Sequence, residues 1–112
     1  MKLPNAWRAV VDERKVRDYL LSRSHPVGCF KAAQLARAGF GEGDWKALVT
    51  QLRRLAVRGI AHRGHASDYG QKYVVSGTLR RGSGIELHVT TVWIVPGLGR
   101  PPRFVTLFPR KR

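Results

Sequence analysis

The sequence is poor in cysteine and has no long apolar stretch. Cys29 is the single cysteine among the 112 residues, so no disulfide can form within the chain. A lone thiol is typical of proteins that work in a reducing compartment, and we therefore expect a cytoplasmic protein. No segment approaches the roughly 20 consecutive apolar residues of a membrane-spanning helix, and the first residues contain no apolar run of signal-peptide length. These absences predict a soluble protein without a membrane partner.

Acidic residues are scarce as well. The chain has 7 Asp and Glu against 21 Lys and Arg, a net charge of +14, and Asp68 and Glu86 are the only acids within residues 45–112. This scarcity argues against a two-carboxylate glycosidase and against a nuclease whose magnesium is held by carboxylates. A positive field of this size attracts polyanions, and arginine forms forked contacts with phosphate. We therefore expect RNA or an acidic protein as the partner, although an arginine-rich composition without a binding role would produce the same excess.

Metal and nucleotide motifs are also missing. His62 and His65 are three residues apart, but no cysteine or carboxylate pair near them completes a zinc site. The glycine-rich segments 82–84 and 97–99 lack the Lys-Ser/Thr of a phosphate-binding loop, and each lies between predicted strands. The sequence therefore predicts neither a metal site nor a cofactor.

The apolar pattern changes from a helical period to an alternating one near Gly59. Before this point, N-cap residues and apolar positions three and four apart predict helices at residues 12–22, 30–38 and 44–58. After it, β-branched and aromatic residues predict strands at residues 72–79, 85–95 and 103–108, with a further short strand near 60–62.

This order of elements predicts an α+β fold, in which three N-terminal helices pack on one face of a C-terminal antiparallel three- or four-stranded meander. We expect one domain over residues 1–112. Its helical part covers about residues 1–59, its sheet about residues 60–108, and a basic tail residues 109–112. The tail is either an arm for an anionic ligand or a frayed end.

Strand alternation leaves the choice of the open sheet face undecided. The pattern places Thr91 and Trp93 on one face and Val92 and Ile94 on the other, and it divides the last strand into Val105 and Leu107 against Phe104, Thr106 and Phe108. If Val92 and Ile94 cover the helices, Trp93 is free to stack on a base and Thr91 to contact phosphate. The reverse assignment makes Trp93 a core residue.

The remaining polar residues suit metal-independent cleavage of RNA. In that reaction the 2′-hydroxyl attacks the neighbouring phosphorus, which requires a base, an acid and groups that stabilise the charge that develops. These functions are offered by His25, Lys31, Tyr73, Thr91, Arg103 and Thr106. The simpler interpretation makes His25 a residue that ends a helix and Lys31 an ordinary solvated side chain. Candidate nucleic-acid contacts are Arg53, Arg54, Arg58, Lys72, Arg80, Arg81, Thr91 and Trp93.

Several segments together resemble a family of short uncharacterised bacterial domains, and the resemblance runs nearly end to end. They are Leu3-Pro4-Asn5-Ala6, residues 11–21, His25-Pro26-Val27-Gly28 with Lys31-Ala32, residues 69–73, Gly77, residues 91–95 and residues 102–106. Members of that family are similar to standalone small proteins or to the C-terminal tips of toxin-like proteins. Their order of elements is similar to that of the barnase, colicin and RelE-like ribonuclease toxins, which implies metal-independent cleavage of RNA.

The resemblance implies that His25, Lys31, Tyr73, Arg103 and Thr106 form the catalytic site of a ribonuclease toxin. In this hypothesis His25 is the general base or acid, Lys31 and Arg103 stabilise the phosphorane charge, and Thr106 and Tyr73 position the phosphate. The basic surface implies an acidic antitoxin or immunity protein as the partner. Two alternatives stay open: a non-catalytic RNA- or DNA-binding module, and a basic interaction protein bound by an acidic partner.

Overall fold

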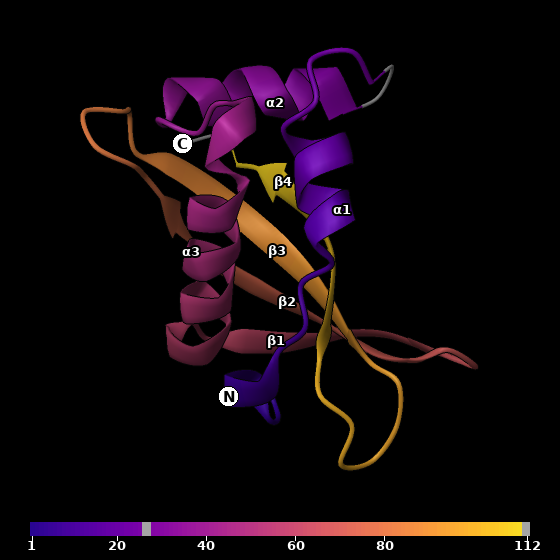
Figure 1. Cartoon of the computed structure of the whole chain (residues 1–112). Coiled ribbons are helices and arrows are strands. Elements are labelled where there is room, and N and C mark those ends of the chain that lie inside the picture. Colours follow the sequence, from indigo (N-terminus) through magenta and orange to yellow (C-terminus); the bar gives the residue numbers. More distant parts are fainter. Residues whose placement is uncertain (26–27, 111–112) are drawn as a thin grey trace.

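The computed structural model of the chain describes residues 1–25 and 28–110. Pro26 and Val27, which lie between the first two predicted helices, and the tail residues Lys111 and Arg112 are outside the described residues. Three α-helices are followed by a four-stranded antiparallel sheet, which confirms the predicted α+β class and the order of its parts. Figure 1 shows the helices gathered in the upper and left part of the view, with the hairpin of β1 (Ala61–Ser67) and β2 (Gly70–Leu79) projecting away from them to the right. No helix in the described part of the chain has the length and apolar character needed to cross a membrane.

The predicted first helix consists of two parts. α1 (Glu13–Lys15) continues directly into a π-helical turn, η2 (Val16–Leu20), and Asp12 caps α1 by accepting a hydrogen bond from the Arg14 amide (2.9 Å). Val16 and Leu20 are fully buried, as the apolar spacing predicts. The wider π turn is a feature that apolar spacing cannot reveal.

The other two helices lie close to their predicted ranges. α2 (Gly28–Arg37) begins two residues before the predicted start, and Gly39 follows it with φ 102°, the left-handed conformation that the sequence assigns to a residue beyond a helix end. α3 (Trp45–Arg58) follows a 3₁₀ turn, η3 (Glu42–Asp44), in which the Asp44 carboxylate accepts from the Gly41 amide (2.9 Å).

The sheet has the strand order β1-β2-β3-β4, so each strand pairs with its neighbours in the sequence. The short strand predicted near residues 60–62 is a seven-residue strand. The strands are β1 (Ala61–Ser67), β2 (Gly70–Leu79), β3 (Leu87–Val95) and β4 (Arg103–Pro109). Because β1 begins its pairing with Ala61 opposite Val75, the last residues of β2 have no β1 partner.

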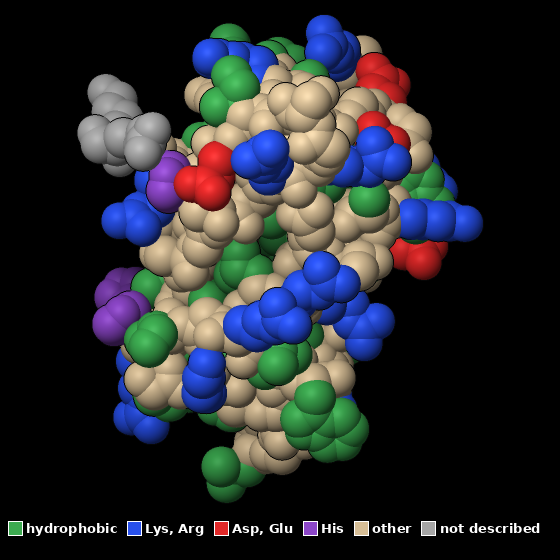
Figure 2. Space-filling view, turned by 90° about the vertical axis from the view of Figure 1, so that its left-hand side faces the viewer, with side chains coloured by type: hydrophobic (Ala, Val, Ile, Leu, Met, Phe, Trp, Pro, Cys, Tyr) green, Lys and Arg blue, Asp and Glu red, His purple; other side chains and the backbone are tan. Residues whose placement is uncertain are grey.

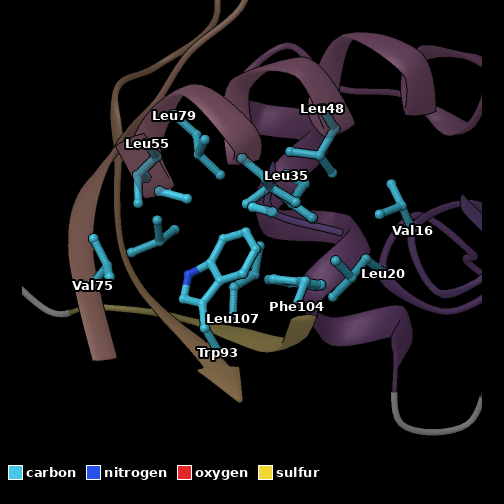
Figure 3. Close-up of a cluster of buried hydrophobic side chains, with 14 of the residues drawn as sticks. Val16, Leu20, Leu35, Leu48, Leu55, Val75, Leu79, Trp93, Phe104 and Leu107 are labelled. Carbon is cyan, nitrogen blue, oxygen red and sulfur yellow. The ribbon is translucent and has the colours of Figure 1, made fainter. Parts of the chain in front are cut away.

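The core combines apolar side chains of the helices with those of one sheet face. Figure 3 shows Leu35 and Leu48 from the helices pointing toward Trp93, Phe104 and Leu107 from the sheet. Trp93 and Thr91 are fully buried, so the interpretation that places them on an open face in contact with nucleic acid is wrong. Burial of the large indole is favourable because its Nε1–H donates to Thr91 Oγ1 (2.8 Å), whose hydroxyl donates to the Val75 carbonyl (2.6 Å).

A bulge in β4 overturns the predicted alternation of that strand. Val92 pairs with Thr106 but Trp93 pairs with Phe104, so Val105 is an extra residue in β4. As a result Phe104 and Leu107 both face the core, although they are three residues apart. Thr106 and Phe108, paired with Val92 and Thr90, lie on the opposite, outer sheet face.

Candidate functional site

Lys31 joins three separate elements of the fold. Its Nζ donates hydrogen bonds to Tyr19 Oη of η2 (3.2 Å) and to Thr106 Oγ1 of β4 (3.0 Å), and it lies 4.5 Å from the centre of the Phe108 ring. The Lys31 side chain is half-buried. Two hydroxyls and an aromatic face thus hold an ammonium group at the edge of the sheet, where α2 passes beside β4. The predicted pair Lys31 and Thr106 is in direct contact.

The β4 bulge also anchors α1. Lys15 Nζ donates to the carbonyl oxygen of Val105, the extra residue of the bulge (2.7 Å). This contact places the start of η2 next to β4, and Tyr19 follows Lys15 by four residues, about one helical turn. The bulge therefore fixes the positions of two ammonium groups, one through its carbonyl and one through the Thr106 hydroxyl.

His25 lies on the other side of Tyr19. The two ring centres are 4.8 Å apart and the ring planes are nearly perpendicular, at 85°. The backbone carbonyl of His25 accepts from the Cys29 amide (3.0 Å), so the residue also begins the hydrogen bonding of α2. Tyr19 therefore contacts both His25 and Lys31, and the three side chains form one cluster with Thr106.

The cluster opens to solvent through a shallow pocket of roughly 680 Å³. Its lining residues are Lys15, Tyr19, Lys31, Val105, Thr106 and Phe108. A second pocket of about 220 Å³ shares Lys15 and Val105 with the first, and it contains the exposed side chain of Arg103. The Arg103 pocket therefore adjoins the Lys31 pocket, and both lie at the β4 edge of the sheet.

The side chains that line the Lys31 pocket carry positive charge, because Lys15 and Lys31 lie there and the nearby Asp18 forms an ion pair with Arg17. Asp18 accepts a hydrogen bond from Arg17 Nε (2.9 Å), and this bond together with the positive charge lowers the pKa of the Asp18 carboxyl. Asp12 lines the Arg103 pocket but accepts from the Arg14 amide. No carboxylate lines the Lys31 pocket, so the site suits an anion.

Tyr73 does not join the other predicted catalytic residues. Its side chain is 5% exposed and belongs to the core, and its accessible edge lines a different pocket together with Asn5 and Leu98. β2 carries Tyr73 on the same face as Trp93, opposite the face of Thr106. The structure therefore does not bring Tyr73 together with Lys31 and Thr106, and a role of Tyr73 in positioning phosphate stays a prediction.

The other predicted nucleic-acid contacts lie on the surface. All six basic residues of this prediction are exposed: Arg53, Arg54, Arg58, Lys72, Arg80 and Arg81. Arg81 forms an ion pair with Asp44 (3.6 Å). Figure 2 shows Lys and Arg side chains spread over one side of the molecule, with Asp and Glu visible only toward its upper part.

Three residues of the site have no counterpart in the sequence-based prediction: Lys15, Tyr19 and Phe108. Tyr19 follows Val16 at helical spacing and precedes Leu20, so the pattern assigns it to the core, whereas its hydroxyl points to Lys31. Phe108 is 51% exposed although alternation groups it with the core residue Phe104.

Within residues 1–25 and 28–110, no group of three or more His, Cys, Asp or Glu side chains is arranged to hold a metal ion.

The chain matches a known protein family in sequence and is similar to a solved structure in its fold. The profile of a domain of unknown function, DUF6883, matches residues 2–111. A chain from a contact-dependent growth inhibition toxin–immunity protein complex of Klebsiella pneumoniae 342 is similar in structure, with a TM-score of 0.69 and 17% sequence identity over 90% of this chain and 99% of that one. No curated protein matches the sequence. At this identity the likeness establishes a shared fold.

Proposed function

Starting from the fact that this chain belongs to the DUF6883 family, whose function is unknown, we propose that it is a toxin that acts as a metal-independent endoribonuclease. The observation that carries the proposal is the position of Lys31. Its ammonium group is held between the Tyr19 and Thr106 hydroxyls in an open pocket, and no carboxylate is among the described residues that line it. The Tyr19 ring also contacts the ring of His25. Such a pocket favours a phosphodiester and the additional negative charge of its transition state.

The reaction assigns one role to each side chain. His25 takes the proton of the attacking 2′-hydroxyl, the 2′-oxygen forms a bond to phosphorus, and the bond to the 5′-oxygen of the next nucleotide breaks. The protonated His25, or a water that it polarises, returns a proton to that leaving oxygen. Lys31 and Arg103 stabilise the negative charge on the phosphoryl oxygens, and Thr106 positions the phosphate. Tyr19 takes the positioning role that the sequence assigns to Tyr73, because it contacts both His25 and Lys31.

The charge distribution favours a toxin with an acidic partner over a generic basic protein. The similar chain comes from a complex of a toxin with an immunity protein. A net charge of +14 is complementary to an acidic protein, and electrostatic complementarity accelerates association and excludes wrong partners. The proposed partner is accordingly an acidic antitoxin or immunity protein that covers the Lys31 pocket.

Cleavage of RNA in the presence of a chelator tests this function. The purified protein should cut a pool of transfer and messenger RNA with EDTA present, and Lys31→Met should lower the rate by about 100-fold or more, the size expected for loss of a charged transition-state contact. The matched control is Lys46→Met, which removes an exposed lysine of α3 that does not line the Lys31 pocket. His25→Ala should be as impaired as Lys31→Met while both variants keep the wild-type unfolding transition.

The other outcomes separate the alternatives. RNA that is retained on a filter but never cut would replace the enzyme by a non-catalytic binding module. RNA that is neither cut nor retained at low salt would leave the acidic protein as the only partner. Loss of cleavage in EDTA would contradict the metal-independent reaction.

A further inference from the structure

A further cationic pocket, separate from the Lys31 and Arg103 pockets, lies between the end of α3 and the free end of β2. It has a volume of roughly 330 Å³, and its lining residues are Gln51, Arg54, Leu55, Arg58, Gly59, Ser76, Gly77 and Thr78. Because β1 begins its pairing opposite Val75, the peptide groups of residues 76–78 that point away from β3 have no strand partner. We propose that this pocket binds a second, non-reacting phosphate of the RNA backbone, an inference that rests on the proposed function.

The two arginines at the pocket, Arg54 and Arg58, form no ion pair with the described residues of the chain. Arg54 and Arg58 are both exposed and four residues apart, so they project from the same side of α3. The ion pairs among residues 1–25 and 28–110 involve Arg17, Arg81 and His88, which leaves these two guanidinium groups without a carboxylate. Like charges at this spacing destabilise a helix by about 0.2–0.5 kcal/mol, so the pair is better explained by an anionic ligand than by stability.

The rest of the lining suits a phosphate group. Ser76 and Thr78 provide two exposed hydroxyls, and Lys2 Nζ donates to the Arg58 carbonyl (2.6 Å), which brings a third cation to the rim. Leu55 is the one apolar side chain in the lining. The core of a protein–protein interface is mainly apolar, whereas phosphate recognition uses arginine, hydroxyl and backbone N–H donors. The lining therefore favours RNA over an acidic protein as the occupant.

The sheet register connects this pocket to the Lys31 site. Ser76 pairs with Thr90, and Thr90 pairs with Phe108, so the three side chains form a row on the outer face across β2, β3 and β4. Neighbouring strands are about 4.8 Å apart, which places the backbone of Ser76 roughly 10 Å from that of Phe108. One RNA segment can therefore span both pockets without leaving the sheet. Figure 2 shows a hollow near the middle of the face that it displays, with Lys and Arg side chains below it.

The pocket requires glycine at two positions where α3 approaches β2. A Cβ at Gly77 would lie 2.6 Å from Leu55 Cδ1, and one at Gly59 would lie 2.4 Å from Val75 Cγ1. These glycines let the helix approach the strand closely, so Leu55 closes the floor. Gln51 closes one end, because its side chain donates to the Arg80 carbonyl (2.7 Å) and accepts from the Arg80 amide (3.3 Å).

Binding of an uncleavable oligonucleotide tests the proposal independently of catalysis. The probe is a single-stranded RNA of about 12 nucleotides with every 2′-hydroxyl methylated, which lacks the attacking group. Arg54→Gln/Arg58→Gln should weaken binding about tenfold, equivalent to about 1.4 kcal/mol. For this variant, the slope of log K against log salt concentration should be smaller in magnitude than that of the wild-type protein by about 0.7, the value for one phosphate contact on a single strand. The control Arg63→Gln/Arg100→Gln removes the same charge from exposed positions outside the pocket and should change affinity less than threefold, or about 0.7 kcal/mol.

A second pair of variants keeps the test valid if the arginine variant is poorly folded. Thr78→Glu places a carboxylate at the pocket and should weaken the oligonucleotide about tenfold, whereas Ser83→Glu, in the exposed β2–β3 turn, should have little effect. In cleavage assays Arg54→Gln/Arg58→Gln should raise KM for a long RNA and leave a dinucleotide, which fills only the Lys31 pocket, unaffected.

The outcomes distinguish this inference from the proposed function. If the wild-type protein cuts no RNA but the pocket variants still weaken the oligonucleotide more than their controls, the pocket stands and the catalytic proposal fails. If cleavage depends on Lys31 but the pocket variants behave like their controls, the second phosphate site is overturned. Selective loss of binding to an acidic protein, with the oligonucleotide unaffected, would also overturn it.

Discussion

At the scale of single residues, Tyr19 links the proposed base His25, through its ring, to the proposed charge-stabilising Lys31, through its hydroxyl. Tyr19→Phe keeps the ring beside His25 but removes the oxygen that accepts from Lys31 Nζ. We expect kcat to fall about tenfold with KM nearly unchanged, because the ammonium group keeps its charge but loses part of its orientation. The control is Tyr69→Phe, since Tyr69 is 83% exposed on the β1–β2 hairpin. Equal rates for the two variants would remove Tyr19 from the site.

A second residue-scale prediction concerns the buried hydroxyl of Thr91. It accepts from Trp93 Nε1 and donates to the Val75 carbonyl, and all of this lies in the core. Thr91→Val has nearly the same shape but leaves two buried polar groups unsatisfied, so the free energy of unfolding should fall by about 1–3 kcal/mol. Thr90→Val, on the outer face of the same strand, should change it by less than about 0.5 kcal/mol. Denaturant titration measures both, and a neutral Thr91→Val would show that water satisfies these groups.

At the scale of elements, the contact between α3 and β2 depends on Gly77. Gly77→Ala places a methyl group 2.6 Å from Leu55 Cδ1 and should destabilise the fold by about 1–3 kcal/mol. Gly64→Ala is the matched control in β1, where the new Cβ finds its nearest neighbour, the Lys72 Cβ, at 3.7 Å. The double variant Gly77→Ala/Leu55→Ala should be more stable than the sum of the single effects, because the two side chains compete for one space. Strict additivity would contradict that close packing.

The elements also show what a sequence can predict and why the rest is out of its reach. The helices and strands follow from apolar periods, and the pairing of Lys31 with Thr106 agrees with residues chosen for their chemistry. The bulge at Val105 was not predictable because it adds no unusual residue type and yet reverses the face of every later side chain in β4. Tyr19 was missed because a tyrosine at apolar spacing serves the core with its ring and the site with its hydroxyl. Both errors concern how side chains point, which depends on tertiary contacts.

At the scale of the whole molecule, the net charge has opposite effects on stability and on binding. Repulsion among 21 basic groups, with 7 acids to offset them, opposes the compact state, so added sodium chloride should raise the unfolding temperature. The same salt should weaken RNA binding, with log K falling by about 0.7 per phosphate contact for each tenfold rise in salt concentration. Thermal melts and filter binding in one salt series check both signs. An unfolding temperature that falls with salt would show that the charges are already paired within the fold.

The Lys31–Thr106 contact joins positions 75 residues apart, and β4 is the last strand of the chain. During synthesis the proposed site therefore cannot form until β4 has left the ribosome and paired with β3. The same arrangement suits the protein to being divided. A cut in the loop between β3 and β4 would separate Tyr19, His25 and Lys31 from Thr106, so that neither fragment alone would contain the complete proposed site.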